Sequence, residues 1–274
     1  MDNRVSSFSP IVLAILIVAA SIELAYGTFY VGLAFLFLAS FLLFFSATKL
    51  KSKEKFERSS LMMVTGIVVI LADLVLNYVM LSEVQTFDTM LLLFGFSLIF
   101  YGSGNRYAEI GKFGVYFALI FLVLFAFLFM LPARVSMYFP YLYGHYAVAV
   151  PVVRVLEVLG IDVRIADFRL IEVLGENHAL LRIDLACFGW YSLLLVTSMV
   201  TAYNITFRWK NWSSIWRILI VLIVSVYLAN LLRVATLVYL TYRFGTDFML
   251  LVHSHLGWIF FVLVLLPLSY KLLR

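Results

Sequence analysis

Long apolar stretches, separated by short polar or basic segments, run along almost the whole chain. Each approaches the roughly 20 residues that an α-helix needs to cross a hydrocarbon core of about 30 Å. Eight such stretches are present, at approximately 9–27, 29–48, 61–81, 88–103, 113–132, 186–204, 214–241 and 248–270. The pattern predicts an all-α polytopic membrane protein with about eight transmembrane helices and a single transmembrane domain, residues 1–274.

Composition supports this prediction. The 274 residues are 65% hydrophobic and 13% charged, whereas soluble domains are about half apolar and about a quarter charged. The excess apolar surface must therefore face lipid. The net charge of +5 does not indicate a nucleic-acid partner, because the basic residues gather in the short connections between apolar stretches, where anionic lipid headgroups attract them.

The connections also predict the orientation, because Lys and Arg are enriched on the cytoplasmic side of a membrane. If the basic loop 49–60 is cytoplasmic, both termini and thirteen of the twenty basic residues lie on that side. We therefore expect a multi-pass protein of the plasma membrane, with the N- and C-termini inside and the long connection 134–184 outside.

The connection 134–184 is the one sizeable segment predicted outside the bilayer. Residues 147–160 carry two charged side chains on an otherwise apolar stretch, which suits a short helix at the membrane interface. Residues 163–174 and 179–186 alternate between apolar and polar, and Gly175-Glu176-Asn177 joins them, which indicates a β-hairpin. We expect this small helix and hairpin to deliver the chain to the sixth span.

Three chemically functional residues fall at the outer ends of consecutive predicted spans. Cys187, the only cysteine in the chain, begins the sixth span, and His253 opens the eighth. Arg233 lies in the seventh span, about nine residues or roughly 13 Å of helix below its outer end. The three side chains are therefore expected to converge in the outer leaflet.

This combination of residue types points to cysteine chemistry. An arginine within a span costs about 2.5–3.5 kcal/mol on insertion scales, so Arg233 is expected to face the bundle interior, on the same helical face as Asn230. A thiol is a nucleophile as the thiolate, and a nearby cation or histidine favours that form. We expect His253 to take the Cys187 proton and return it to a leaving amine, while Arg233 stabilises the thiolate or the developing oxyanion.

These residues stand in three motifs that resemble those of the exosortase/archaeosortase family. The motifs are Ala186-Cys187-Phe188-Gly189, Asn230-Leu231-Leu232-Arg233-Val234, and His253 followed four residues later by Gly257-Trp258. Their order, spacing and placement on the last three spans match over roughly 165–262. The chain differs at one position, because Phe188 stands where family members commonly have Ser or Ala.

The resemblance implies a membrane-embedded cysteine protease and transpeptidase. Such an enzyme removes a C-terminal sorting signal, made of a short motif, a transmembrane helix and a basic tail, and passes the secreted protein to a new anchor, which in archaea is a lipid. Carried over by position, Cys187 is the nucleophile that forms a thioester, Arg233 its electrostatic partner and His253 the general base. The implied partners are secreted proteins with a sorting helix and a membrane lipid as acceptor, met at the extracytoplasmic face.

Some assignments stay open at the level of sequence. His255 stands two residues from His253 and is the alternative base, although His253 keeps the family's spacing. Asp184, shortly before the cysteine, is a candidate to orient His253 or Arg233, and Asn230 is a further candidate for a supporting role. No cofactor is expected, and no metal, because one Cys and one or two His offer too few ligands.

Two other classes of function compete with the enzyme. In a transporter or channel, Arg233 would bind an anionic substrate or gate the pore, and Asp73 or Glu23 would carry protons. Arg233 also has a structural alternative as the ion-pair partner of one of these two acids. An idle scaffold for tail-anchored partners is the third class. The transporter is disfavoured because the chain shows no internal repeat and no matched pair of broken helices.

Overall fold

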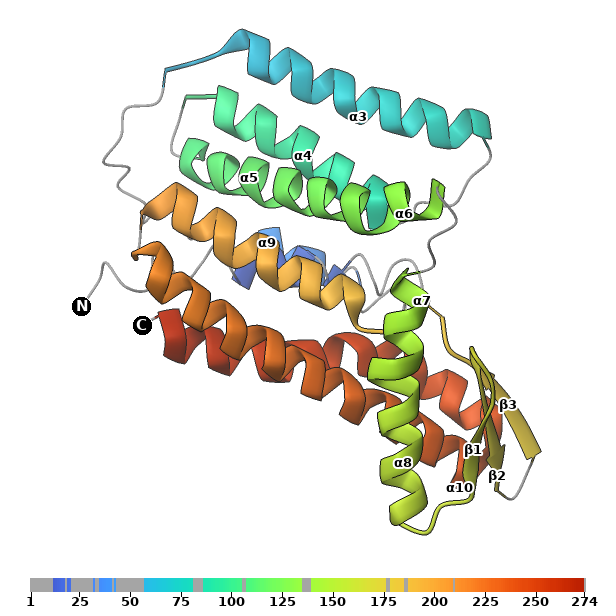
Figure 1. Ribbon diagram of the computed structural model, residues 1–274. Coiled ribbons are helices and arrows are strands. Elements are labelled where there is room, and N and C mark those ends of the chain that lie inside the picture. The colour runs from blue at the N-terminus through green and yellow to red at the C-terminus, as the bar shows by residue number, and fades with distance from the viewer. Residues whose placement is uncertain are drawn as a thin grey trace. The chain divides into compact units, whose positions relative to one another are not determined.

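The computed structural model of the chain describes most residues from 57 onward and short pieces before them. The described residues are 12–17, 19–20, 32, 35–40, 42, 57–80, 86–104, 107–134, 139–175, 178–184, 187–208 and 210–273. They are mostly helical, with one small sheet (Figure 1). The chain divides into two compact units: Met1–Leu124, Leu195–Leu219 and Tyr270–Arg274 form the first, and Phe125–Leu194 and Ile220–Ser269 form the second.

Glycines allow the helices of the first unit to approach one another closely. Helix α3 (Ser60–Met80) lies against α4 (Thr86–Gly102), and a Cβ atom added to Gly66 would come within 2.5 Å of the carbonyl oxygen of Gly95. Between hydrophobic helices in lipid, close packing of small residues replaces hydrophobic burial as the source of association. This contact is therefore of the kind expected inside a membrane.

The surface of α3 is apolar and exposed almost all round. Its exposed large side chains are Leu61, Val64, Ile67, Val68, Leu71, Leu74, Val75, Leu76, Tyr78, Val79 and Met80. Such a surface is unfavourable in water and is typical of lipid contact. Asp73 is buried instead, and its carboxyl group hydrogen-bonds Asp88 of α4. This acid, one of the two considered as a partner of Arg233, thus has a partner within the first unit, and Glu23 lies outside the described residues.

Four of the eight predicted spans correspond to separate helical stretches of the structure. They are α3, α4, the stretch formed by α5 (Ala108–Phe125), η1 (Ala126–Met130) and α6 (Leu131–Arg134), and α9 (Trp190–Phe207). The predicted spans 214–241 and 248–270 both lie in α10 (Trp212–Leu273), which is broken at Gly245 by non-helical angles, φ 81° and ψ 176°. The helix breaks inside the predicted connection because glycine adopts a positive φ without steric cost.

The number of membrane crossings is not confirmed. Within the described residues, three helical stretches are long and apolar enough to span a bilayer: Ser60–Met80, Ala108–Met130 and Trp212–His253. Thr86–Gly102 is a shorter apolar helix. The predicted spans 9–27 and 29–48 lie largely outside the described residues, although 12–17 and 35–40 are helical.

The predicted extramembrane connection forms a helix and a sheet in the second unit. The helix begins as α7 (Phe139–Tyr143), continues as the π-helical turn η2 (Gly144–Ala149) and ends as α8 (Val150–Val158), so it starts earlier than the predicted 147–160. The sheet has three antiparallel strands in the order β1-β2-β3: β1 (Val163–Asp167), β2 (Leu170–Leu174) and β3 (His178–Arg182).

The predicted hairpin is confirmed, because β2 and β3 pair antiparallel with Leu174 opposite His178, but the sheet has a third strand that was not predicted. The segment 163–174 is not one strand, because the chain reverses at Phe168 and Arg169 and pairs β1 with β2, with an irregular register between Ile165 and Asp167. A tight turn of two residues keeps the alternation of side chains on either side of it, so a pattern of period two does not reveal the reversal.

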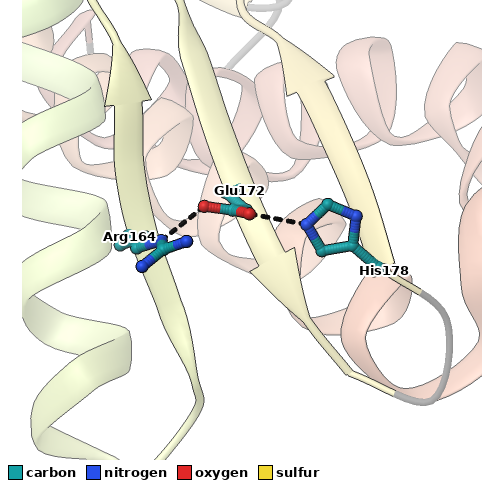
Figure 2. Close-up of polar contacts among 3 residues, drawn as sticks. All are labelled: Arg164, Glu172 and His178. Atoms are coloured by element: carbon teal, nitrogen blue, oxygen red, sulfur yellow. Dashed lines mark hydrogen bonds and ion pairs between the residues drawn. The ribbon is translucent and has the colours of Figure 1, made fainter.

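The two faces of the sheet differ in character. The buried face packs against α8, Phe188 and α10 in a core that contains Val163, Ile171, Val173, Val152, Val153, Leu156, Val234 and Val238. The exposed face carries Glu172 between Arg164 and His178, one residue on each strand (Figure 2). Hydrogen bonds from Arg164 and, to a smaller extent, from His178 lower the pKa of the Glu172 carboxyl to about 2. The sheet is thus fixed to α10 on one side and cross-linked by charges on the other.

Candidate active site

Cys187 lies in a tight turn between the sheet and the start of α9. Its backbone N–H donates a hydrogen bond of 2.8 Å to the carbonyl oxygen of Asp184. Its own carbonyl oxygen accepts a hydrogen bond of 3.0 Å from the Nδ2 atom of Asn230 on α10. The turn is therefore held from both sides, and the cysteine, which is partly buried, sits against the core of the second unit.

Gly189 allows this turn to press against α10. The residue has a φ of 71°, and a Cβ atom added there would lie 2.6 Å from Cγ of Asn230. Only glycine adopts a positive φ at little cost, and only glycine leaves room for the asparagine. The glycine of the cysteine motif therefore has a packing role as well as a conformational one.

Replacing Gly189 by alanine is expected to destabilise the protein by about 1–3 kcal/mol, because it combines backbone strain with a clash against Asn230. Gly160→Ala is the matched control, since Gly160 has a similar φ of 78° but no atom within 4 Å of its added Cβ. Thermal unfolding of both variants, together with the alkylation rate of Cys187, measures the difference. Equal effects of the two alanines would mean that the Asn230 contact has no role.

Phe188, the residue that departs from the family pattern, fits its surroundings closely. Its side chain is only 2% exposed and its ring packs edge-on against Tyr141, with ring centroids 5.8 Å apart. Gly144 provides the space, because a Cβ there would overlap the Phe188 ring. The absence of a side chain at Gly144, the first residue of η2, thus makes room for the large Phe188 ring.

Arg233 and His253 come together because α10 is broken. On an unbroken helix they would be about 30 Å apart, yet the two groups interact electrostatically. Gly245 stands about twelve residues after Arg233 and about eight before His253, so a reversal there leaves an offset of roughly 6 Å along the axis. The long arginine side chain can bridge such an offset. Figure 1 shows α10 turning back on itself.

Arg233 is the residue that links the other two predicted site residues. It interacts electrostatically with the Cys187 thiol as well as with His253. Asn230, three residues earlier on the same face of α10, is 7% exposed. The structure thus brings the sequence-predicted Cys187, Arg233 and His253 into one unit, and the charge of Arg233 interacts with both other groups. A cation in that position can stabilise a thiolate or an oxyanion formed beside it.

The supporting residues have more definite roles than the sequence suggested. Asn230 anchors the backbone of the cysteine turn. His255 is two residues from His253, which is about 200° around the helix axis, so the two imidazoles leave α10 on different sides.

The carboxylate of Asp184 forms ion pairs with Arg169 and Arg182. The sequence suggested instead that it would orient His253 or Arg233. Sequence reasoning missed Arg169, because nothing in its position within an apparent strand marks it as the partner of Asp184.

Comparison with known proteins identifies the family. A family model described as transmembrane exosortase matches residues 8–270, nearly the whole chain. Searches of curated proteins and of solved structures found no match. The match covers most of the first unit, all of the second, the connection 134–184 and the three motifs. The chain therefore belongs to the transmembrane exosortase family and is a membrane protein.

Proposed function

We propose that the protein is an intramembrane cysteine protease and transpeptidase that removes the C-terminal sorting signal of secreted proteins through a thioester on Cys187. The observation that carries this proposal is that Asn230 of α10 donates a hydrogen bond of 3.0 Å to the backbone of Cys187, three residues before Arg233, whose charge interacts with the thiol and with His253, in a chain of the exosortase family. A cation beside a lone cysteine is an arrangement that favours a reactive thiolate. A transporter would not need the cysteine.

In the proposed reaction, His253 accepts the proton of Cys187, and the thiolate sulfur attacks the carbonyl carbon of the scissile peptide bond. Arg233 stabilises the negative charge, first on sulfur and then on the carbonyl oxygen of the tetrahedral intermediate. The intermediate collapses to a thioester as the C–N bond breaks, and His253 donates its proton to the departing amine of the sorting helix. His253 then takes the proton of a lipid hydroxyl or of water as its oxygen attacks the thioester carbonyl carbon, the C–S bond breaks, and the Cys187 thiolate is released.

The proposed setting is the plasma membrane, with both termini in the cytoplasm and the site at the extracytoplasmic face. This orientation rests on the distribution of basic residues. The substrate is a secreted protein held by its C-terminal transmembrane helix, which reaches the site from within the bilayer. Its short recognition motif then lies beside the sheet that precedes Cys187.

Intact-mass spectrometry of a co-expressed secreted reporter tests the function. The reporter ends in a candidate motif, a transmembrane helix and a basic tail, and a second reporter lacks the hydrophobic helix. The tail is expected to be lost only from the first reporter and only when the chain is present. A free carboxyl group at the new C-terminus indicates hydrolysis, and a lipid-sized mass increase indicates transfer. Reporters uncut for every candidate motif, with a Cys187 thiol inert to alkylation at neutral pH, would contradict the proposal.

A further inference from the structure

The sheet contains two separate ion-pair networks, and one of them is joined to the cysteine turn. In that network the Asp184 carboxylate pairs with Arg169, from the turn between β1 and β2, and with Arg182 of β3, at 3.0 Å. The backbone reinforces the link, because the N–H of Ile183 donates to the carbonyl oxygen of Arg169 at 2.9 Å. Asp184 in turn accepts the backbone hydrogen bond of Cys187. The sheet and the turn are therefore one connected structure.

Arg169 is also connected, through Tyr141, to Phe188, the residue that follows the cysteine. Its guanidinium lies over the ring of Tyr141, 4.2 Å from the ring centroid, and Tyr141 packs against Phe188. A cation over an aromatic face is attracted by the ring quadrupole. Contacts thus connect Asp184 with Arg169, Arg169 with Tyr141, and Tyr141 with Phe188. Asp184 precedes Cys187 in the chain and Phe188 follows it, so these contacts link the two sides of the cysteine turn.

The second network offers a matched comparison. Glu172 pairs with Arg164 and with His178, at 2.6 Å for the histidine, on the exposed face of the same sheet (Figure 2). This network ties the three strands to one another. Like the first network, it places a carboxylate between two basic side chains, but it lies within the strands rather than where the chain leaves the sheet for Cys187.

We propose that Asp184 and Arg169 are positioning residues, which hold the Cys187 thiol at the place where Arg233 can stabilise its thiolate. The proposal rests on the function proposed above and adds a role for the extramembrane sheet. The thiol needs a fixed position because a displacement of about 1 Å at a reacting group can reduce the rate by roughly 10²-fold. Two arginines and one aromatic ring fix the turn through Asp184 and Phe188, its neighbours in the chain.

Alkylation of Cys187 as a function of pH tests this role. The signal is unambiguous because the chain has one cysteine. Arg169→Met and Asp184→Asn are expected to lower the alkylation rate at neutral pH about tenfold or more and to move the midpoint of the pH–rate profile upward, because the thiolate loses the stabilisation from Arg233. Arg164→Met and Glu172→Gln are the controls, and their rates and midpoints are expected to stay at the wild-type values.

The proposal is overturned if the two pairs of variants give the same profile, or if the rate falls in Arg169→Met and Asp184→Asn without a shift of the midpoint. Melting temperatures of all four variants separate loss of position from loss of fold. Because alkylation needs no substrate, the test is independent of the proposed function. A midpoint shift in Asp184→Asn with none in the controls supports the positioning role whether or not the wild-type chain cuts a reporter.

Discussion

The variant Cys187→Ala is expected to lose removal of the sorting helix by about 10⁴-fold or more, because the substitution removes the nucleophile on which the covalent route depends. Alanine is close to cysteine in size and keeps the backbone hydrogen bonds of the turn to Asp184 and Asn230. The fold and its insertion in the membrane are therefore expected to survive. Intact-mass spectrometry of the reporter, followed over time in membranes of both proteins, measures the difference.

Cys187→Ser sharpens this comparison, because it retains a hydroxyl at the position of the thiol. A serine hydroxyl ionises far less readily than a thiol, so the neighbouring cation cannot convert it to a nucleophile near neutral pH. We expect the serine variant to be nearly as inactive as the alanine variant. Reporter cleavage at the wild-type rate in either variant would exclude the thioester. Transport or scaffolding would survive both substitutions, so this pair also separates the enzyme from its two competitors.

The helical part of the molecule was largely predictable, because the pattern that defines it is local. Apolar stretches of the right length became α3, α4, α5 and α9, and the polar connection between the last two predicted spans became the break at Gly245. Placing the outer ends of consecutive spans together predicted that Cys187, Arg233 and His253 lie near one another, and in the structure the charge of Arg233 interacts with the other two groups. The order and direction of the predicted spans were thus enough to suggest which residues belong to the site.

The sheet was harder to predict, since its contacts join residues that the sequence pattern treats as equivalent. Arg164 and Arg169 both stand in an alternating segment, yet one cross-links the exposed face and the other pairs with Asp184 beside the cysteine. The difference arises from the reversal at Phe168 and Arg169, which alternation cannot show. The role of Gly144 in admitting Phe188 was hidden for a similar reason, because it depends on two residues far apart in the chain.

Replacing Arg233 by methionine is expected to lower reporter cleavage by about 10²–10³-fold, the loss found when a donor to a developing oxyanion is removed. The same change should leave the melting temperature unchanged or raise it. An arginine within a span costs about 2.5–3.5 kcal/mol on insertion scales, and methionine removes that cost while keeping a long side chain. A gain or constancy of stability with a large loss of activity is the behaviour of a residue retained for chemistry.

Arg217→Met is the matched control, because Arg217 lies on the same helix α10 but is exposed, with its guanidinium near the Ser214 hydroxyl at 3.4 Å. Both its activity and its stability are expected to stay at the wild-type values. If Arg233 served mainly as the partner of a buried acid, its removal would leave that charge uncompensated and cost about 3–5 kcal/mol. The loss of activity would then follow the fall in melting temperature, and Arg233 would have to be assigned to the structure of α10 rather than to the reaction at Cys187.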